Sequence, residues 1–134
     1  MDQTALNNNM IDGQIRPING ISKEIILAFS SINRSHFVPE DLTKRSYTEK
    51  NLKLSSDRYL LRPNLIGEII KQVAPKINET ILVLPAATGY SSAIISNLAE
   101  TVISIEEDDN FISIAESGLK KSGINNVAII KKKI

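Results

Sequence analysis

The chain has 134 residues, of which 42% are hydrophobic and 23% charged, so it has the length and composition of one folded domain. Sixteen basic residues against fifteen acidic ones leave a net charge of +1, which predicts no nucleic-acid partner. The absence of cysteine and the single histidine exclude disulfides and metal sites built from several such ligands, and no apolar run approaches the roughly 20 residues of a membrane span. With no signal peptide in the sequence, we expect a cytoplasmic protein without a membrane partner or a metal.

The first 32 residues predict two short helices. Residues 1–9 are polar, and we expect them to be frayed. A short helix is predicted over residues 10–15 and ends before Pro17, because the residue before a proline avoids the helical conformation. Ser22 is typical of an N-cap, and apolar residues follow it at helical spacing. They form the expected inner face of a second helix: Ile25, Ile26, Phe29 and Ile32.

The middle of the chain predicts a connector, an irregular segment and a third helix. His36 lies in the connector, and we expect it to be solvated or hydrogen-bonded locally rather than catalytic. Residues 40–59 lack a helical period, and the alternation around Leu52 predicts a short β segment. Pro63 suits the first turn of a helix, and Pro75 ends it. The apolar stripe of this helix is Leu65, Ile66, Ile69, Ile70 and Val73.

Residues 80–107 predict a β-strand, a helix and a second β-strand, and the rest of the chain is organised around them. Two apolar runs, residues 81–84 and 102–105, are too short for core helices and are rich in branched side chains. The segment between them starts with a turn of small residues that ends at Gly89 and continues as a helix. The second run is followed directly by Glu106.

This arrangement is typical of a nucleotide-binding edge of a parallel sheet. Ligands lie beyond the carboxyl ends of the strands, and a turn of small residues lets them approach the backbone. Glu106 follows the turn by close to the roughly 20 residues expected of a carboxylate that accepts hydrogen bonds from a ribose diol. The same pattern also fits an ordinary βαβ packing unit without a ligand. A nicotinamide-binding half-domain fits the layout but would need glycines that the turn lacks.

The remaining residues complete a three-stranded sheet. A helix is predicted over residues 110–121 and a third strand over residues 127–130. Right-handed crossovers then give the strand order 3-2-1, with the first strand at one edge. We therefore predict an α/β, Rossmann-like fold with a partial parallel sheet and N-terminal helices. An apolar edge strand invites pairing with another chain, so we expect a sequence that is cut short and self-association through this edge.

Taken in order, these segments resemble the protein-L-isoaspartate O-methyltransferases, a family of enzymes that use S-adenosylmethionine. The resemblance extends over about residues 10–130 and depends on an ordered series of motifs. The matching segments are residues 14–16 and 20–21, 33–39 (NRSHFVP, for the family's PRxxFVP), 46–49 (SYTE, for AYxD), 60–63 (LLRP, for ISxP), 81–90 (ILVLPAATGY, for VLEIGxGxGY) and 102–106 (VISIE, for VxSIE).

The resemblance implies transfer of a methyl group from S-adenosylmethionine to the carboxylate of isoaspartyl residues in damaged proteins. It implies an N-terminal helical and substrate-side segment over residues 1–62 and an incomplete cofactor-binding half over residues 63–134. The family's substrate segment falls at Leu61, Arg62 and Pro63. The positions that would bind the cofactor are Ala86, Ala87, Thr88, Gly89, Tyr90 and Glu106.

Three positions depart from the family pattern. Pro85 replaces the first glycine of the turn, Val83 an acidic residue, and Leu61 the serine of the substrate segment. A proline removes an N–H donor and fixes φ, and the other two changes remove polar groups. We therefore expect cofactor binding to be weak or lost, and with the expected serine replaced by Leu61 the sequence identifies no catalytic residue. The alternatives are a non-catalytic remnant of the family and an interaction module that pairs strands with a partner.

Overall fold

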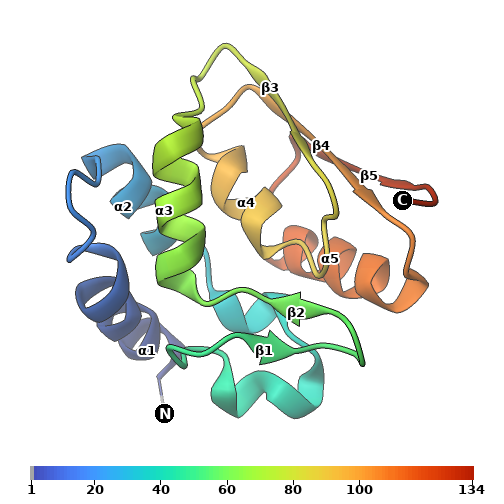
Figure 1. Cartoon of the computed structure of the whole chain (residues 1–134), viewed down its shortest axis with the longest axis horizontal. Coiled ribbons are helices and arrows are strands. Elements are labelled where there is room, and N and C mark those ends of the chain that lie inside the picture. Colours follow the sequence, from blue (N-terminus) through green and yellow to red (C-terminus); the bar gives the residue numbers. More distant parts are fainter. Residues whose placement is uncertain (1) are drawn as a thin grey trace.

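The computed structural model describes residues 2–134 and contains one parallel sheet of three strands (Figure 1). The strands are β3 (Thr80–Val83), β4 (Thr101–Glu106) and β5 (Val127–Lys131), in the order β3-β4-β5. The registers place Leu82 beside Ile103 and Ile103 beside Ala128. The predicted order 3-2-1 and the edge position of the first strand are therefore confirmed.

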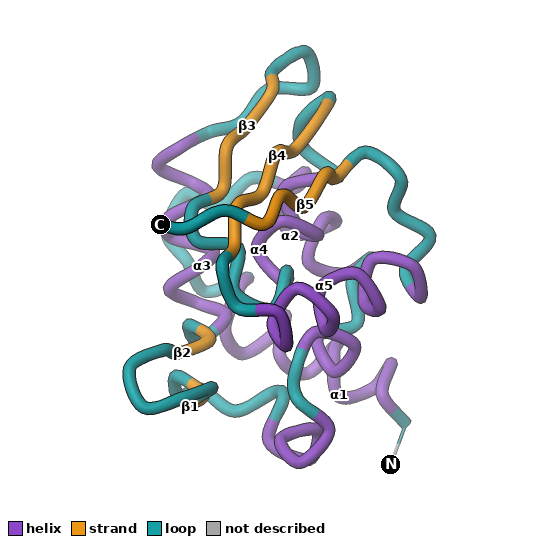
Figure 2. Tube along the Cα trace, turned by 90° about the vertical axis from the view of Figure 1, so that its right-hand side faces the viewer, coloured by secondary structure: helices purple, strands orange, loops and turns teal. Residues whose placement is uncertain are grey.

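Three helices cover one face of this sheet (Figure 2). They are α3 (Pro63–Val73), α4 (Tyr90–Ser96) and α5 (Asp109–Lys121). The proline at the start of α3 occupies a position where its missing N–H costs no intrahelical bond, as the sequence predicted. The α5 helix begins after Asp108, whose side chain accepts a hydrogen bond from the N–H of Phe111 at 2.9 Å.

The two faces of the sheet differ in what covers them. Val102, Ser104 and Glu106 of β4 point toward the helices and are buried. The side chains of the opposite face include Leu82 and Ile130, which are 57% and 45% exposed. Within residues 2–134 no helix lies over this second face (Figure 2). The sheet therefore has a buried side and an open apolar side.

The N-terminal residues are ordered where the sequence predicted fraying. The α1 helix (Gln3–Met10) continues into a π-helical turn, η1 (Ile11–Ile15), and the chain then turns at Pro17. Two contacts of polar residues hold α1 in place, and the hydrophobic pattern of the sequence does not show them. Asp2 accepts a hydrogen bond from the N–H of Thr4, and Asn7 is buried against the end of α2 (Lys23–Ser30). The prediction of fraying is wrong for residues 2–9, and residue 1 lies outside the described residues. Ser22 is the N-cap of α2, as predicted.

The segment between α2 and α3 forms two short 3₁₀ helices and a hairpin. The 3₁₀ helices are η2 (Arg34–Phe37) and η3 (Glu40–Arg45), and the hairpin pairs β1 (Leu52–Lys53) with β2 (Tyr59–Leu60). The predicted short β segment is present. The sequence missed η3 because a single short 3₁₀ helix has no 3.6-residue period to detect.

One hydrophobic core runs through the molecule and takes side chains from both sides of residue 62. Tyr90 at the start of α4 is fully buried, and its ring contacts those of Phe29 and Phe37, with centroids 6.3 and 6.1 Å away. The division into residues 1–62 and 63–134 stays a prediction. None of the helices formed by residues 2–134 is long and apolar enough to cross a membrane.

Candidate functional site

The turn after β3 folds onto the carboxyl end of β4. It begins with a cis peptide bond between Leu84 and Pro85. The N–H of Ala86 donates to the carbonyl of Ile105 at 2.8 Å, which fixes the turn beside the end of the neighbouring strand. Ala87 adopts a left-handed conformation with φ of 50°. The turn is therefore held against β4 by a backbone contact that needs no particular side chain.

Gly89 ends the turn and starts α4 at a point where α4 and α5 nearly touch. Its φ is +92°, and a Cβ built on it would lie 2.7 Å from the Cβ of Ala115 in α5. A methyl group does not fit in that space, and the backbone conformation is one that other residues rarely adopt. The packing of two helices thus explains this glycine, and its predicted role beside a cofactor stays a prediction.

Glu106 is the polar centre of this edge. Its side chain is fully buried, and its two oxygens accept five hydrogen bonds. Oε1 accepts from the N–H of Ala87 at 2.7 Å and from Nη2 of Arg58 at 2.6 Å. Oε2 accepts from the N–H groups of Glu107 and Asp108, both at 3.0 Å, and from Nη1 of Arg58 at 3.2 Å. The turn after β3 and the tip of β4 are therefore bridged by one carboxylate.

The surroundings of Glu106 keep it ionised. Burial by itself raises the pKa of a carboxyl group, but the hydrogen bonds from Arg58 and from the amides of Asp108 and Ala87 outweigh this effect and lower the pKa of Glu106. The same pairing raises the pKa of Arg58. Both groups are charged at neutral pH, and the pair is bidentate, which is the stronger geometry for an arginine and a carboxylate.

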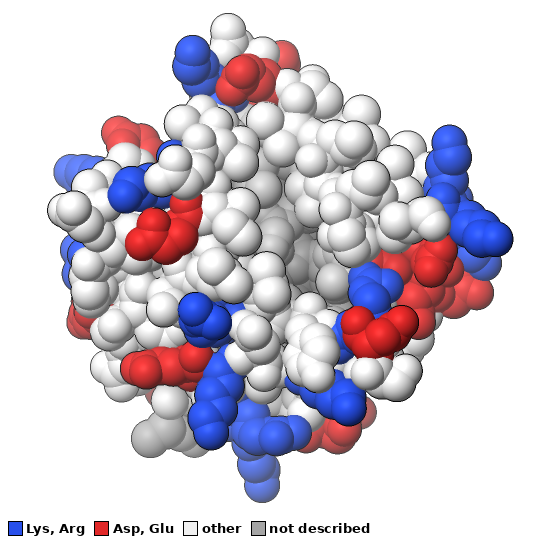
Figure 3. Space-filling view, in the orientation of Figure 1, with Lys and Arg blue, Asp and Glu red and all other residues white. Residues whose placement is uncertain are grey.

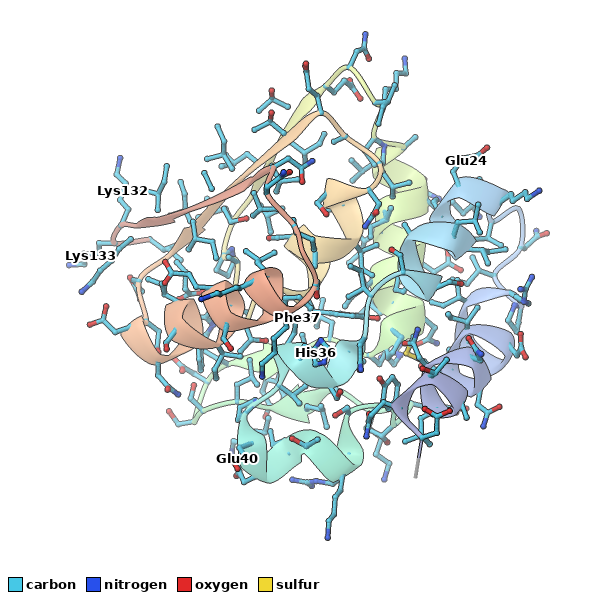
Figure 4. All side chains as sticks on the ribbon, turned by 180° about the vertical axis from the view of Figure 1, so that it is seen from behind. Glu24, His36, Phe37, Glu40, Lys132 and Lys133 are labelled. Carbon is cyan, nitrogen blue, oxygen red and sulfur yellow. The ribbon has the colours of Figure 1, made fainter. Side chains whose placement is uncertain are left out.

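Arg58 reaches Glu106 from the loop of the β1–β2 hairpin. Its guanidinium carbon lies 5.1 Å from the centroid of the Phe111 ring, and its side chain is 22% exposed. Arg58 lines a cleft of about 570 Å³ beyond the carboxyl ends of β4 and β5. Charges of both signs line this cleft; its residues are Ser55, Asp57, Arg58, Glu107, Asp108 and residues 131–133. Lys132 and Lys133 project outward from the end of β5 (Figure 4).

A second arginine, Arg34, is fully buried beneath the turn. Its guanidinium carbon lies 4.7 Å from the centroid of the Tyr90 ring, and its Nη2 donates to the carbonyl of Leu61 at 3.0 Å. Its Nε donates to the carbonyl of Ser46. Burial lowers the pKa of Arg34 and raises that of Tyr90. Arg34 thus joins η2, the segment before α3 and the start of α4.

The predicted substrate segment lies beside an apolar hollow. This hollow, of about 250 Å³, is formed between α3 and β3 and opens in an uncharged part of the surface (Figure 3). Leu61, Val83 and Leu84 all line it. Two of the departures from the family pattern, Leu61 and Val83, therefore make the same hollow apolar. Arg62 is the residue before α3 and makes no capping hydrogen bond with its side chain, and Pro63 is buried there.

The connector histidine lies beside α5. His36 and Phe37 belong to η2, which packs under α5 (Figure 4). A Cβ on Gly118 of α5 would lie 2.5 Å from the Phe37 ring. Burial and the nearby Lys121 lower the pKa of His36. The residues described contain no group of three or more acidic, histidine or cysteine side chains that could hold a metal ion.

The structure brings together the two features on which the predicted site depends, the turn and Glu106. Of the predicted cofactor positions, Ala87 is half-buried and the others are buried. Sequence reasoning missed both arginines. Arg34 belongs to a segment that the family resemblance had singled out, so its buried role had a signal. Arg58 lies in a polar stretch without a pattern, and nothing in the sequence pointed to it.

The residues at this edge fit a nucleoside in position and in chemistry. Glu106 accepts two adjacent N–H groups from Arg58, and a ribose diol presents two adjacent O–H donors to the same kind of acceptor. Thr88 adds a buried hydroxyl oxygen without a hydrogen-bond partner within the described residues. The oxygens of Glu106 are already occupied by Arg58, so a ribose could reach them only in place of that side chain.

Comparisons of the sequence with known proteins agree on one family. The sequence model of the protein-L-isoaspartate(D-aspartate) O-methyltransferase family matches residues 5–132. A protein-L-isoaspartate O-methyltransferase of Syntrophus aciditrophicus is 30% identical over 120 residues, which is 90% of this chain and 55% of that protein. One from Petrotoga mobilis is 25% identical over 130 residues, covering 96% of this chain and 61% of that protein. The chain therefore spans little more than half the length of these curated relatives.

Solved structures show the same fold. A protein-L-isoaspartate O-methyltransferase superposes on 98% of this chain and 42% of its own, with a TM-score of 0.76 and 21% identity. A Plasmodium falciparum beta-aspartate methyltransferase in complex with S-adenosyl-L-homocysteine superposes on the whole chain and 64% of its own, with a TM-score of 0.70 and 16% identity. The motif order, the strand order and the match over residues 5–132 lead to one conclusion. This chain belongs to the protein-L-isoaspartate O-methyltransferase family.

Proposed function

We propose that this chain is a cofactor-binding half of a protein-L-isoaspartate O-methyltransferase and that it binds S-adenosylmethionine across the carboxyl ends of β3 and β4. The observation that carries this proposal is the buried carboxylate of Glu106, held 2.7 Å from the Ala87 amide of the turn. In this proposal Glu106 accepts the ribose hydroxyls, and the backbone of residues 86–89 lies along the nucleoside. The complex of the Plasmodium falciparum protein with S-adenosyl-L-homocysteine supports the ligand class.

The proposed acceptor is the side-chain carboxylate of an isoaspartyl residue. S-adenosylmethionine supplies a methyl group on a positively charged sulfur, so an ionised carboxylate needs positioning and exclusion of water rather than a strong base. The chain's contribution to positioning is the segment at Leu61, Arg62 and Pro63, which leads into α3 beside the apolar hollow. These three residues stay candidates for substrate contact.

We expect the 134 residues alone to bind the cofactor but to transfer its methyl group only slowly. Leu61 and Val83 line the same hollow and carry no hydrogen-bonding group, whereas a carboxylate acceptor and an amino acid moiety both need polar partners. Pro85 also removes one N–H donor from the turn. The cytoplasmic location expected from the sequence stays a prediction.

Calorimetric titration with S-adenosylhomocysteine tests the cofactor site. We expect saturable binding to the native chain and roughly tenfold or more weaker binding to Glu106→Ala, because hydrogen bonds to a carboxylate are lost. Glu116→Ala is the matched control, since Glu116 is an exposed glutamate on α5 that does not line this cleft. Equal affinities of the Glu106→Ala and Glu116→Ala chains would contradict a ribose contact at Glu106, and no binding either to the native chain or to a chain in which Arg58 is replaced would contradict the proposed function.

A methyl-transfer assay tests the proposed acceptor. The substrate is a peptide with one isoaspartyl residue, and the control is the same peptide with a normal aspartyl residue. We expect slow incorporation of radiolabelled methyl groups into the isoaspartyl peptide only, and none above background with Glu106→Ala. Equal incorporation into both peptides would contradict isoaspartyl specificity.

A second candidate function is strand pairing through the open edge of the sheet. The observation in its favour is the exposure of Leu82 and Leu84, which are 57% and 53% exposed at the β3 side of the sheet. An apolar edge strand is a template for another strand. The proposed partner is a second copy of this chain, and an oligomeric-state measurement separates this function from cofactor binding.

A further inference from the structure

We propose that Arg58 occupies the place of the ribose diol on Glu106, so that a nucleoside binds only when the β1–β2 hairpin releases this arginine. The inference rests on the proposed function, because it concerns the same carboxylate. It goes beyond that function by assigning a competing residue within the chain.

Glu106 cannot accept hydrogen bonds from Arg58 and from a ribose diol at the same time. A carboxylate offers about four lone-pair positions, and Glu106 already accepts five N–H groups. Three of the donors are backbone amides, at Ala87, Glu107 and Asp108, and they are fixed by the path of the chain. The remaining two belong to Arg58. A ribose that reaches Glu106 must therefore replace Arg58 and not the amides.

The guanidinium group matches the diol in geometry. Two parallel N–H groups of Arg58 meet the two oxygens of Glu106 at 2.6 and 3.2 Å. A vicinal diol presents two adjacent O–H donors in a similar fork, which a single carboxylate accepts. Arg58 additionally brings a positive charge, so it is favoured electrostatically over a neutral sugar.

Arg58 lies in a loop whose position allows its side chain to move away from Glu106. It lies in the loop between β1 and β2, each of which is only two residues long. Ser56 and Asp57 of this loop are exposed, so little packing restrains it. The cleft beside the pair contains Asp57, Glu107 and Asp108, and these carboxylates can receive the displaced guanidinium. Release of Arg58 therefore gives the guanidinium another carboxylate partner, while Glu106 keeps the hydrogen bonds from its three backbone amides.

The experiment is a double-variant cycle read by calorimetric titration with S-adenosylhomocysteine. Arg58→Met removes the guanidinium fork that lies over the Phe111 ring but keeps an apolar stem of similar length, so the fold is preserved better than with alanine. We expect this variant to bind roughly tenfold or more tightly than the native chain, because the competing ion pair is gone. Adding Glu106→Gln to Arg58→Met should abolish the gain, which shows that it acts through this carboxylate. Arg45→Ala, at an exposed arginine, is the control and should leave the affinity unchanged.

The outcomes separate this inference from the proposed function. If the native chain binds and Arg58→Met binds equally or more weakly, Arg58 is a scaffold for Glu106 and the inference is wrong while the cofactor site stands. A gain that persists in the double variant also overturns the inference, since the effect then bypasses Glu106. If no variant binds, the cofactor site itself is refuted and the competition with it. Circular dichroism melts of each variant confirm that the comparison is made between folded chains.

Discussion

At the scale of single residues, Gly89 has the sharpest steric requirement. Replacing it with alanine places a Cβ 2.7 Å from the Cβ of Ala115 and 3.1 Å from its Cα, at a φ of +92°. We predict a loss of about 2–4 kcal/mol in the free energy of unfolding, from strain and overlap together. Urea denaturation measures it.

Gly123 provides the matched control for this prediction. Its φ is +67°, but nothing lies within 4 Å of a Cβ built there. Gly123→Ala should therefore cost only the backbone strain, about 1 kcal/mol. Equal losses at the two glycines would show that α4 and α5 do not approach as closely as described.

Arg34 is the second residue whose removal should be costly. Its fully buried guanidinium donates to the carbonyls of Ser46 and Leu61 and lies against the Tyr90 ring. Arg34→Met keeps the apolar stem but leaves those carbonyls without donors, so we predict a loss of about 2 kcal/mol or more in urea denaturation. The exposed Arg45, changed to methionine, should have an effect within about 0.5 kcal/mol. A similar small effect at Arg34 would contradict the structural role assigned to it.

Some residues of the site could be predicted from the sequence and others could not, for a physical reason. Glu106 was predictable because a carboxylate directly after a buried strand has a defined position at the edge of a parallel sheet. Its partner Arg58 comes from 48 residues away in a loop, and no local pattern encodes such a contact. The need for Gly89 was predicted from ligand approach, whereas the structure explains it by contact with Ala115.

At the scale of elements, the β1–β2 hairpin is attached to the sheet through Arg58 and Glu106. The pKa of Glu106 is lowered from its ordinary value of 4.5 in the folded chain. A depressed folded pKa means that the unfolded chain binds more protons, so this contribution to stability is full above pH 4.5 and is lost as the pH falls through the folded pKa. The hairpin should therefore loosen in acid.

We predict that amide hydrogen exchange in residues 52–60, corrected for the intrinsic effect of pH, increases as the pH falls from about 6 to about 3. In Glu106→Gln the exchange should already be raised at neutral pH and should change less with acid, because the titrating group is gone. A native chain whose hairpin protection is the same at both pH values would contradict the attachment through this pair.

Element prediction succeeded where burial produces a regular pattern. The α2, α3 and α5 helices each carry an apolar face with a clear period, and the three strands are short apolar runs rich in branched side chains. The α1 helix was not predicted, because its sequence is polar and its stability comes from the Asp2 cap and from Asn7 packed against α2. Tertiary contacts of that kind are formed by residues far apart in sequence, and a local pattern does not record them.

At the scale of the whole molecule, the open edge at β3 is the main feature that the described residues leave uncovered. In residues 2–134 β3 is hydrogen-bonded to β4 alone, and Leu82 on it is 57% exposed. If this edge pairs with a second copy, analytical ultracentrifugation should show a dimer that Leu82→Lys converts to a monomer, because an edge lysine opposes strand addition.

Ile77 supplies the control for the edge. It is 73% exposed but precedes β3, so Ile77→Lys adds the same charge outside the strand and should leave the dimer intact. A native chain that sediments as a monomer at all concentrations, or a dimer that both variants dissolve equally, would contradict pairing through β3.

The proposed nucleoside site lies between the turn after β3 and the tip of β4. The most direct test is a titration of the ¹⁵N-labelled chain with S-adenosylhomocysteine, followed by NMR. We expect the largest shifts at the amides of Ala87, Glu107 and Asp108, which donate to Glu106, and at the Nε of Arg58. Shifts confined to other parts of the molecule, or none at saturating ligand, would contradict it.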